Sequence, residues 1–422
     1  YVAAYEAAPG EVNDLTVQDV AGSIVLNDPG AEITPGEGCA ATTTHSATCT
    51  SEFGLSSAYA DLGDEADHFI SEGPPFSVEG GAGDDVLEGG TAGGTFDGDE
   101  GDDILRGGAH VSGFSGGDGA DQMIGTEESD RFMGGPGPDS IDGRGEFQAD
   151  WSEGDVVSYE DHDAPVTVDL SKPGSPAGAA GEGDVLTNVE SVYGGQGPDK
   201  LTARKELFST GFGSGLGGAG GDDLIRGGPG RDTLAGGGGD DSVRGGGDDD
   251  LLKGGPGRDT LIGGGGSNEL WSFDARRPER DSVRCGEGGS VYAGSAAAPV
   301  LDAVDQSCGY VDLWGPIVDR VVYGYVGRPT RAVKSTVECL RHCGLTIRLR
   351  AHGKLLGSAT REIRGIGSAT LAIPLTRAAR DELKRAGMLK LGFAMDISWG
   401  ARLRHPQATS WHLLLHDPPA AR

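Results

Sequence analysis

The sequence predicts an all-β protein, built as a parallel β-solenoid of the β-roll type and followed by a smaller C-terminal β-sandwich. The 422-residue chain contains 77 glycines, and only 36% of its residues are hydrophobic, which is too few for ordinary globular cores. No Gly-X-Y period supports collagen, so a solenoid or disorder remains. A repeat of nine residues favours the solenoid.

Charge divides the chain into two parts. Residues 319–422 carry 18 Lys and Arg against 7 Asp and Glu, a local charge of +11, so the net charge of -32 leaves -43 on residues 1–318. An acidic segment of this kind opposes its own compaction unless it collects cations. Nucleic acid is therefore not an expected partner.

Residues 1–79 are expected to form solenoid coils and a cap that lead into the repeats. Short alternating segments at 15–20 and 23–26 suggest strands, and a loop pinned by Cys39 and Cys49 follows them. No charged, apolar leader stands at Tyr1, so we expect a mature secreted form whose signal peptide has been removed.

Residues 80–144 contain the first run of repeats. From Gly80 to Asp142 the chain divides into seven units of nine residues, each of which starts with glycine. Most carry Asp at position six, and all carry an apolar residue at position eight: Leu87, Phe96, Leu105, Phe114, Met123, Phe132 and Ile141. Two units are expected to make one coil of about 18 residues, with position eight pointing inward.

Residues 218–271 contain a second run with the same period. Its position-eight residues are Ile225, Leu234, Val243, Leu252, Leu261 and Leu270. One inward side chain contributes roughly 1.5 to 3 kcal/mol, whereas ordering each residue of a unit costs about 1 to 2 kcal/mol. Burial alone is insufficient, and a cation held by carboxylates and turn carbonyls could supply the difference.

The repeat resembles the RTX (repeats-in-toxin) calcium-binding family, whose nonapeptide is GGxGxDxUx. The resemblance implies that position-six carboxylates and turn carbonyls of stacked turns hold Ca²⁺. In the first run it assigns one edge to calcium, with Gly94 and Ser112 interrupting the alternate edge. In the second run it assigns both edges. The predicted metal ligands are Asp85, Asp103, Asp121, Asp130, Asp139, Asp199, Asp223, Asp232, Asp241, Asp250, Asp259 and Asn268. The alternative is that these carboxylates merely solubilise a glycine-rich linker.

Residues 145–217, between the runs, are expected to form irregular coils of the same solenoid. Alternation at 155–159 and 166–170 suggests strands. The stretch 164–170, followed by Gly181-Glu182-Gly183-Asp184, resembles an element of bacterial secreted RTX-type proteins. Asp184 or Glu182 could bind calcium, or both could be ordinary turn residues.

Six cysteines fall into three local pairs, which predict disulfides in an oxidising compartment: Cys39 with Cys49, Cys285 with Cys308, and Cys339 with Cys343. Zinc is the alternative, but no pair has CxxC spacing and no histidine set completes a four-ligand site. The second pair predicts a disulfide-closed solenoid cap at residues 272–318.

Residues 319–422 are basic and poor in glycine. They contain strand candidates at 344–351, 369–374, 389–397 and 410–415, with a short helix at 378–386 between Thr376 and Gly387. This segment resembles the immunoglobulin-like β-sandwiches at the C-termini of bacterial surface proteins.

The sequence predicts a secreted, extracellular or cell-surface protein that is not an enzyme. It contains neither HExxH nor GxSxG and no apolar stretch long enough to cross a membrane. A calcium-dependent structural or adhesive protein is favoured over a calcium-stabilised binding module or a secreted hydrolase. Other copies of the chain are possible partners, because solenoid ends invite strand addition and the tail and solenoid carry opposite charges. The alternative to such a filament is a monomer whose tail packs on its own solenoid.

Overall fold

The computed structural model divides the chain into two compact units, Tyr1–Gly220 and Gly221–Arg422. The first unit is described at residues 2–50, 55–110, 112–145, 154–205 and 212–220. The second is described at residues 221–274, 281–286, 290–295, 303–304, 310–314, 321–324, 332–339, 343–351, 354–363, 367–374, 376–377, 388–398 and 409–416. No helix in this described part is long and apolar enough to cross a membrane.

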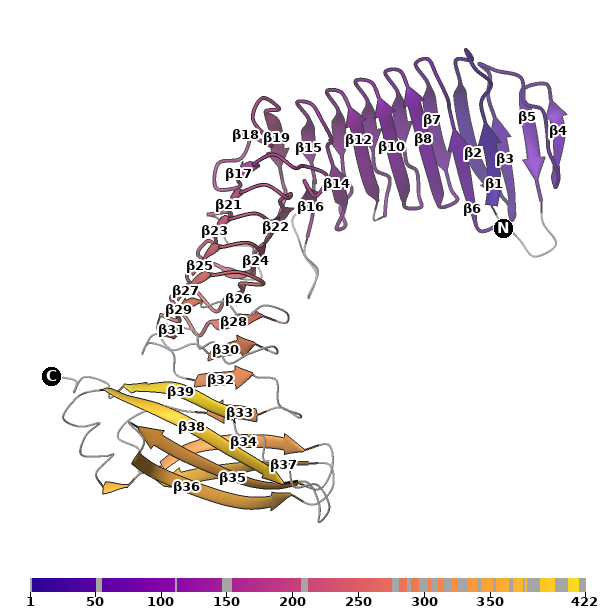
Figure 1. Ribbon diagram of the computed structural model, residues 1–422. Coiled ribbons are helices and arrows are strands. Elements are labelled where there is room, and N and C mark those ends of the chain that lie inside the picture. Colours follow the sequence, from indigo (N-terminus) through magenta and orange to yellow (C-terminus); the bar gives the residue numbers. More distant parts are fainter. Residues whose placement is uncertain are drawn as a thin grey trace. The chain divides into compact units, whose positions relative to one another are not determined.

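Parallel strands stacked one after another build the first unit (Figure 1). Neighbouring strands pair residues that are 18 positions apart, such as Thr95 with Gly113, which confirms the predicted coil. One sheet contains, in order, β1 (Val2–Glu6), β6 (Ser57–Asp61), β8 (Phe76–Ala82), β10 (Gly94–Glu100), β12 (Gly113–Asp118), β14 (Arg131–Met133), β16 (Val156–Ser158), β20 (Ser191–Tyr193) and β22 (Phe212–Gly220).

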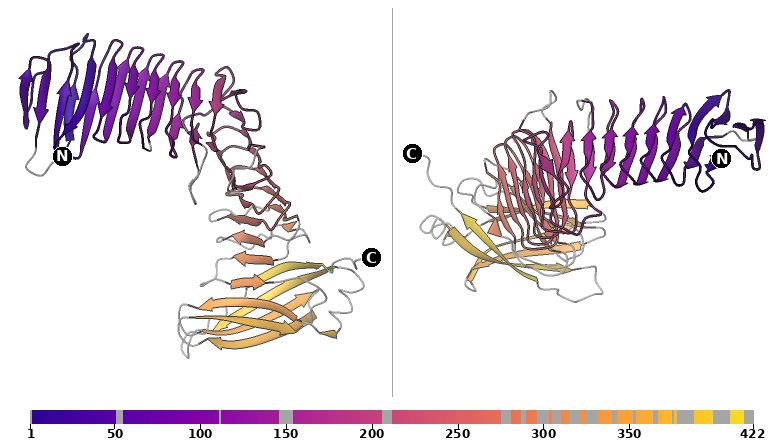
Figure 2. Two further views of the ribbon diagram at one scale, coloured as in Figure 1. Left: turned by 180° about the vertical axis from the view of Figure 1, so that it is seen from behind. Right: turned by 90° about the horizontal axis from the view of Figure 1, so that it is seen from above.

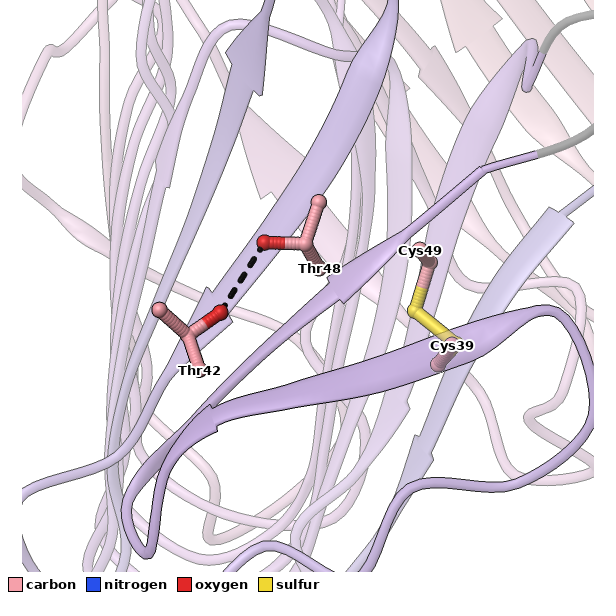
Figure 3. Close-up of a disulfide and its surroundings, with 4 residues drawn as sticks. All are labelled: Cys39, Thr42, Thr48 and Cys49. Carbon is pink, nitrogen blue, oxygen red and sulfur yellow. Dashed lines mark hydrogen bonds between the residues drawn. A yellow bond between two sulfur atoms is a disulfide. The ribbon is translucent and has the colours of Figure 1, made fainter.

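The opposite sheet of the first unit ends in an antiparallel cap. Its parallel strands are β2 (Asp14–Val20), β7 (His68–Glu72), β9 (Val86–Glu88), β11 (Ile104–Arg106), β13 (Gln122–Ile124), β15 (Ser140–Asp142) and β19 (Asp184–Thr187). The cap adds β3 (Ser23–Asn27), β5 (Ser46–Cys49) and β4 (Cys39–Thr43) beyond β2. A disulfide joins Cys39 to Cys49, as predicted, and a hydrogen bond of 3.2 Å joins Thr42 to Thr48 (Figure 3).

An insertion interrupts the repeat inside the first unit. Strand β15, which ends at Asp142, pairs with β19, which begins at Asp184, so this sheet skips the segment between them. The insertion supplies β16 to the first sheet, β17 (Thr167–Asp169), which pairs with β21 (Lys200–Thr202), and β18 (Pro176–Ala177), which pairs with β19 in antiparallel fashion.

Parallel strands continue through the described solenoid part of the second unit. One sheet contains β24 (Arg231–Gly238), β26 (Leu251–Lys253), β28 (Glu269–Asp274), β30 (Ser290–Ser295) and β32 (Tyr310–Trp314). The other contains β23 (Leu224–Arg226), β25 (Ser242–Gly246), β27 (Thr260–Gly264), β29 (Ser282–Arg284) and β31 (Ala303–Val304). The segment predicted as a cap therefore also carries solenoid strands. Cys285 is in a disulfide, and its predicted partner, Cys308, lies outside the described residues.

The core is the predicted line of single apolar side chains. All thirteen position-eight residues of the two runs are buried, with at most 4% of each side chain exposed. A parallel stack with one buried side chain per turn is what a nine-residue period dictates, because equivalent residues of successive coils lie directly above one another.

The described strands of the C-terminal segment are antiparallel (Figure 2). One sheet contains β33 (Val321–Gly324), β34 (Ala332–Cys339) and β37 (Gly367–Pro374). The other contains β36 (Lys354–Ile363), β35 (Cys343–Ala351), β38 (Met388–Ser398) and β39 (Thr409–His416). The four strand candidates are confirmed, while the predicted helix at 378–386 lies outside the described residues. Cys339 ends β34 and Cys343 begins β35, and their pairing stays a prediction.

Candidate calcium sites

The position-six aspartates of one edge form a buried column through the first unit. The backbone N–H of each aspartate donates to Oδ1 of the aspartate one coil later. The four steps run from Asp67 to Asp85 (2.7 Å), to Asp103 (2.8 Å), to Asp121 (2.9 Å) and to Asp139 (3.0 Å). We call Asp67, Asp85, Asp103, Asp121 and Asp139 the first column. The structure thus brings together four predicted ligands and adds Asp67.

The second carboxylate oxygen of each first-column residue accepts no hydrogen bond although it is buried. Burial raises the pKa of Asp85 and Asp121 to about 7, of Asp103 to about 6 and of Asp139 to about 8. An ionised carboxylate in such a place is unfavourable by several kcal/mol unless something compensates its charge. Each buried Oδ2 atom therefore needs a bound proton or a nearby cation to compensate its negative charge.

Glycine at position one brings oxygens of two coils together. A Cβ atom on Gly98 would overlap both Oδ2 of Asp103 and the carbonyl oxygen of Gly116, which belongs to the next coil. The same overlap occurs at Gly116, with Asp121 and Gly134. Carboxylate and carbonyl oxygens are the ligands that Ca²⁺ prefers. The donor set fits calcium, and Oδ2 of the first column with these carbonyls would hold it.

The regular column ends at the insertion. Oδ1 of Asp184 accepts the N–H of Asp139 (3.1 Å), but its Oδ2 accepts the Tyr159 hydroxyl (2.8 Å). The Glu182 carboxylate contacts Nε2 of His162 (2.9 Å). Hydrogen bonds thus engage both residues that were considered as additional calcium ligands, which favours the alternative that they are structural.

The alternate edge of the first unit is organised differently. Ser112 donates to Oδ1 of Asp130 (2.7 Å), Asp130 to Asp155 (2.8 Å), and Asp155 to Oε2 of Glu190 (2.9 Å). Oδ2 of Asp130 accepts the backbone N–H of Thr126 (2.5 Å). Oε1 of Glu190 pairs with the guanidinium of Arg204 (2.6 Å), although burial still raises the pKa of Glu190 to about 7.

Phenylalanine rings also line this alternate edge. Phe76, Phe96, Phe114 and Phe132 form a continuous stack, with ring centroids 5.0, 5.0 and 4.8 Å apart. A Cβ atom on Gly107 would lie 3.0 Å from Cζ of Phe114, so the ring tip reaches the position-one glycine. On the edge of the first column, Asp Oδ2 reaches that glycine instead. On the alternate edge a ring tip lies beside this glycine where position six is Gly94 or Ser112, and beside Gly125 both Oδ2 of Asp130 and Cζ of Phe132 are present.

The second unit has aspartates on both edges. In one column Asp223 donates to Asp241 (2.9 Å), Asp241 to Asp259 (3.0 Å), and Asp259 to Asp281 (2.8 Å). In the other, Asp232 donates to Asp250 (2.9 Å), and Asp250 to Oδ1 of Asn268 (2.9 Å). Oδ2 of Asp241 and of Asp250 is buried and accepts no hydrogen bond. Burial raises the pKa of these two carboxyls to about 6 and about 8.

Besides Asp130, three other predicted ligands have a second side-chain atom that is hydrogen-bonded. Oδ2 of Asp232 accepts the N–H of Gly228 (2.6 Å), and Oδ2 of Asp199 accepts that of Gly195 (2.7 Å). Nδ2 of Asn268 donates to the carbonyl oxygens of Gly265 (2.9 Å) and Cys285 (3.0 Å). The Asn268 amide thus binds two carbonyls directly. These positions differ from Asp241 and Asp250, whose Oδ2 atoms accept no hydrogen bond.

Sequence reasoning missed the column members outside the nonapeptides: Asp67, Asp155, Glu190 and Asp281. Each stands two residues before a buried apolar side chain: Phe69, Val157, Val192 and Val283. That acidic-x-apolar spacing is the signal that could have found them.

Comparison with known families supports calcium binding by the repeats. The model of the RTX calcium-binding nonapeptide repeat matches four times, at residues 79–109, 115–145, 217–252 and 244–272. The chain therefore carries RTX calcium-binding nonapeptide repeats, and these repeats bind several Ca²⁺ ions. No curated protein matches the chain. The matches end at residue 272, and the immunoglobulin-like resemblance of residues 319–422 stays a prediction.

Proposed function

We propose that the protein is a secreted structural or adhesive protein of the cell surface, stiffened by extracellular calcium. The observation that carries the proposal is the row of buried Oδ2 atoms without a hydrogen-bond partner, at Asp85, Asp103, Asp121 and Asp139. These carboxylates sit inside the stack and already accept inter-coil hydrogen bonds, so calcium bound there would act on the fold itself.

Charge explains why calcium would control folding. Residues 1–318 carry -43, and the core is one side chain wide. A metal that binds only the native state adds its binding free energy to folding. RTX-repeat proteins are generally secreted, and the Cys39–Cys49 disulfide suits an oxidising compartment. The chain would remain largely unfolded at low calcium and fold outside the cell.

Calcium titration of the full chain tests the proposal. We expect circular dichroism to show strand signal that appears with calcium, disappears with a chelator and returns when calcium is restored. Magnesium at the same concentration is the control, and it should be far less effective because it prefers near-ideal octahedral geometry and retains its waters. A chain that keeps its full strand signal after verified metal removal would contradict the proposal.

A filament is the second candidate function, and strand β1 favours it. Among the described strands, β1 pairs with β6 and forms the edge of its sheet. Val2 on this edge strand is 55% exposed, and an edge of this kind can accept a strand from another copy. Light scattering at millimolar calcium should then show assemblies that the substitution Val2→Lys disrupts. Monomers across a range of protein and salt concentrations would exclude the filament.

Two other classes remain testable with the same protein. A ligand screen would reveal a calcium-stabilised binding module, and generic protease and esterase substrates would reveal a secreted hydrolase. Activity that persists through independent purifications would replace the structural proposal by the hydrolase.

A further inference from the structure

We propose that the first column binds calcium one coil before the recognised repeats begin, at a site built around Asp67. The matched repeats start at residue 79. The turn at 62–67 reads Leu62-Gly63-Asp64-Glu65-Ala66-Asp67 and has only one of the three glycines that the repeat prefers. This site rests on calcium binding by the matched repeats and extends it to a coil that the sequence pattern rejects.

The Asp67 carboxyl has the same hydrogen-bonding pattern as its neighbours in the first column. Asp67 is 3% exposed, and its N–H donates to Oδ1 of Asp85. Its own Oδ1 accepts the N–H of Asn13 (2.6 Å), while its Oδ2 is buried and accepts no hydrogen bond. Burial raises the pKa of Asp67 to about 6. A buried carboxylate oxygen without a hydrogen bond thus also occurs at Asp67, outside the recognised repeats.

The backbone of this turn also matches the turns of the repeats. Gly63 and Glu65 have φ of 94° and 86°, and the corresponding Gly81 and Gly83 have φ of 101° and 142°. A non-glycine residue such as Glu65 adopts a positive φ only when its surroundings impose it. The turn therefore follows the repeat geometry despite its missing glycines.

Turn carbonyls approach the next coil at the spacing found in the repeats. A Cβ atom on Gly83 would overlap the carbonyl oxygen of Glu65, and one on Gly101 would overlap that of Gly83. Ca²⁺ prefers carboxylate and carbonyl oxygens, and this turn offers both kinds with the backbone spacing of the repeats. Leu62 occupies position one in place of glycine and leaves less room, so we expect Asp67 to be the weakest calcium site of the column.

The preceding residue of the stack shows how a calcium-free position is built. Nδ2 of Asn13 donates to the carbonyl oxygen of Leu62 (3.0 Å), the position-one residue of the next coil. Asn268 makes the equivalent bond to the carbonyl oxygen of Cys285. An amide can therefore satisfy the carbonyl at this place, whereas the carboxylate of Asp67 cannot, because it has no proton to donate when ionised.

The test counts calcium ions bound to the full chain by equilibrium dialysis and elemental analysis. D67N should bind one ion fewer than the unmodified chain and remain folded, because its amide can donate as that of Asn13 does. D103N, at a recognised repeat, is the positive control and should also lose one ion. D84N is the negative control: Asp84 is exposed and accepts a hydrogen bond from Asp102 (3.0 Å), and its loss should leave the count unchanged.

The outcomes separate this site from calcium binding in general. If D103N loses an ion and D67N does not, the Asp67 site is wrong and the repeat sites stand. If the unmodified chain binds no calcium, the proposed function fails together with the site. Should D67N not fold, anomalous diffraction from crystals of the unmodified chain in calcium decides the question. A peak beside Oδ2 of Asp67 supports the site, and its absence when a peak stands beside Asp85 overturns it.

Discussion

The two runs of repeats share one backbone plan but stabilise their second edge in different ways. In the first run, residues 80–144, the edge opposite the aspartates carries the stacked rings of Phe96, Phe114 and Phe132. In the second run, residues 218–271, the corresponding rows are aliphatic and aspartates stand on both edges. The comparison teaches that the nonapeptide can be held by metal or by aromatic packing.

The energetic difference follows from the side chains. Burial contributes roughly 1.5 to 3 kcal/mol for each phenylalanine and each aliphatic side chain alike, but each favourable ring pair of the first run adds about 0.5 to 1.5 kcal/mol. Neither contribution needs an ion. In the second run Asp241 and Asp250 keep a bare buried oxygen on opposite edges. The second run should therefore depend on calcium more strongly than the first.

Calcium removal should produce the largest effect. In chelator, we expect the amides of residues 224–264 to lose nearly all protection against hydrogen exchange, while those of residues 95–133 keep part of theirs because the phenylalanine stack remains. Hydrogen exchange read by mass spectrometry on the full chain measures this directly. Equal exchange in both segments would break the comparison.

Proton binding should give the next largest effect. Burial raises the pKa of Asp139 and Asp250 from 3.8 to about 8, so the folded metal-free chain holds protons that the unfolded chain releases above about pH 4. Stability without metal is therefore greatest at low pH and declines as the pH rises towards about 8. Calcium competes with these protons, so its affinity should fall on acidification.

Circular dichroism of chain stripped of metal on a chelating resin checks this dependence. More strand signal is expected at about pH 5 than at about pH 8.5. Hydroxyl-radical footprinting of Phe114 and Leu252 compares the runs, and Leu252 should show the greater change. A metal-free chain that gains structure as the pH rises would show that the sign is wrong.

Substitution in the phenylalanine stack should have a smaller effect. Phe114→Leu breaks two ring contacts and should lower the stability of the first run in chelator by about 1 to 3 kcal/mol. Met123→Leu on the edge of the first column is the matched control, and a swap of similar volume should cost less than about 1.5 kcal/mol. Hydrogen exchange of residues 95–133 reports both. Equal losses of stability in the two variants would mean that the rings contribute only through their buried volume.

Asn268→Asp should have the smallest net effect when calcium is present. It removes two hydrogen bonds to the carbonyls of Gly265 and Cys285, which should cost about 1 to 3 kcal/mol in metal-free protein. In calcium it should add one bound ion and recover that loss. The reverse change, Asp250→Asn, should remove one ion. An unchanged calcium count in both variants would show that the amide and the carboxylate are equivalent here.

The nine-residue period was sufficient to predict the coil, the inward residues and the aspartate column. Position eight is buried in every unit, as in Leu105 and Leu252, because the period fixes the direction of each side chain. The period also predicted that Gly94 and Ser112 interrupt the alternate edge. It could not predict the stacking of the phenylalanines, since any apolar residue satisfies the pattern.

Other features depend on contacts between distant residues or on turn conformation. Asp155 and Glu190 enter the alternate edge only because an insertion returns to the stack, and no local spacing reveals that return. Whether Oδ2 is bare, as in Asp241, or accepts an amide, as in Asp232, depends on the orientation of the N–H four residues earlier. Asp and Asn look alike in the motif but differ by a proton donor, which decides what Asn268 can bind.

Each aspartate of the first column links two interfaces, and this has a mechanical consequence. Oδ1 of Asp103 holds the coil before it through the N–H of Asp85, while Oδ2 and the carbonyl oxygen of Gly116, in the coil after it, both lie where a Cβ atom on Gly98 would stand. With calcium bound to Oδ2, a pull along the solenoid axis would load the same carboxylate from the coil before it and from the coil after it. Replacement of Asp103 by alanine would weaken both inter-coil interfaces at once. Replacement by asparagine would preserve both interfaces through hydrogen bonds of its amide. Calcium would therefore set the force at which the stack unfolds. The same solenoid would be compliant at low calcium concentration and stiff at high calcium concentration.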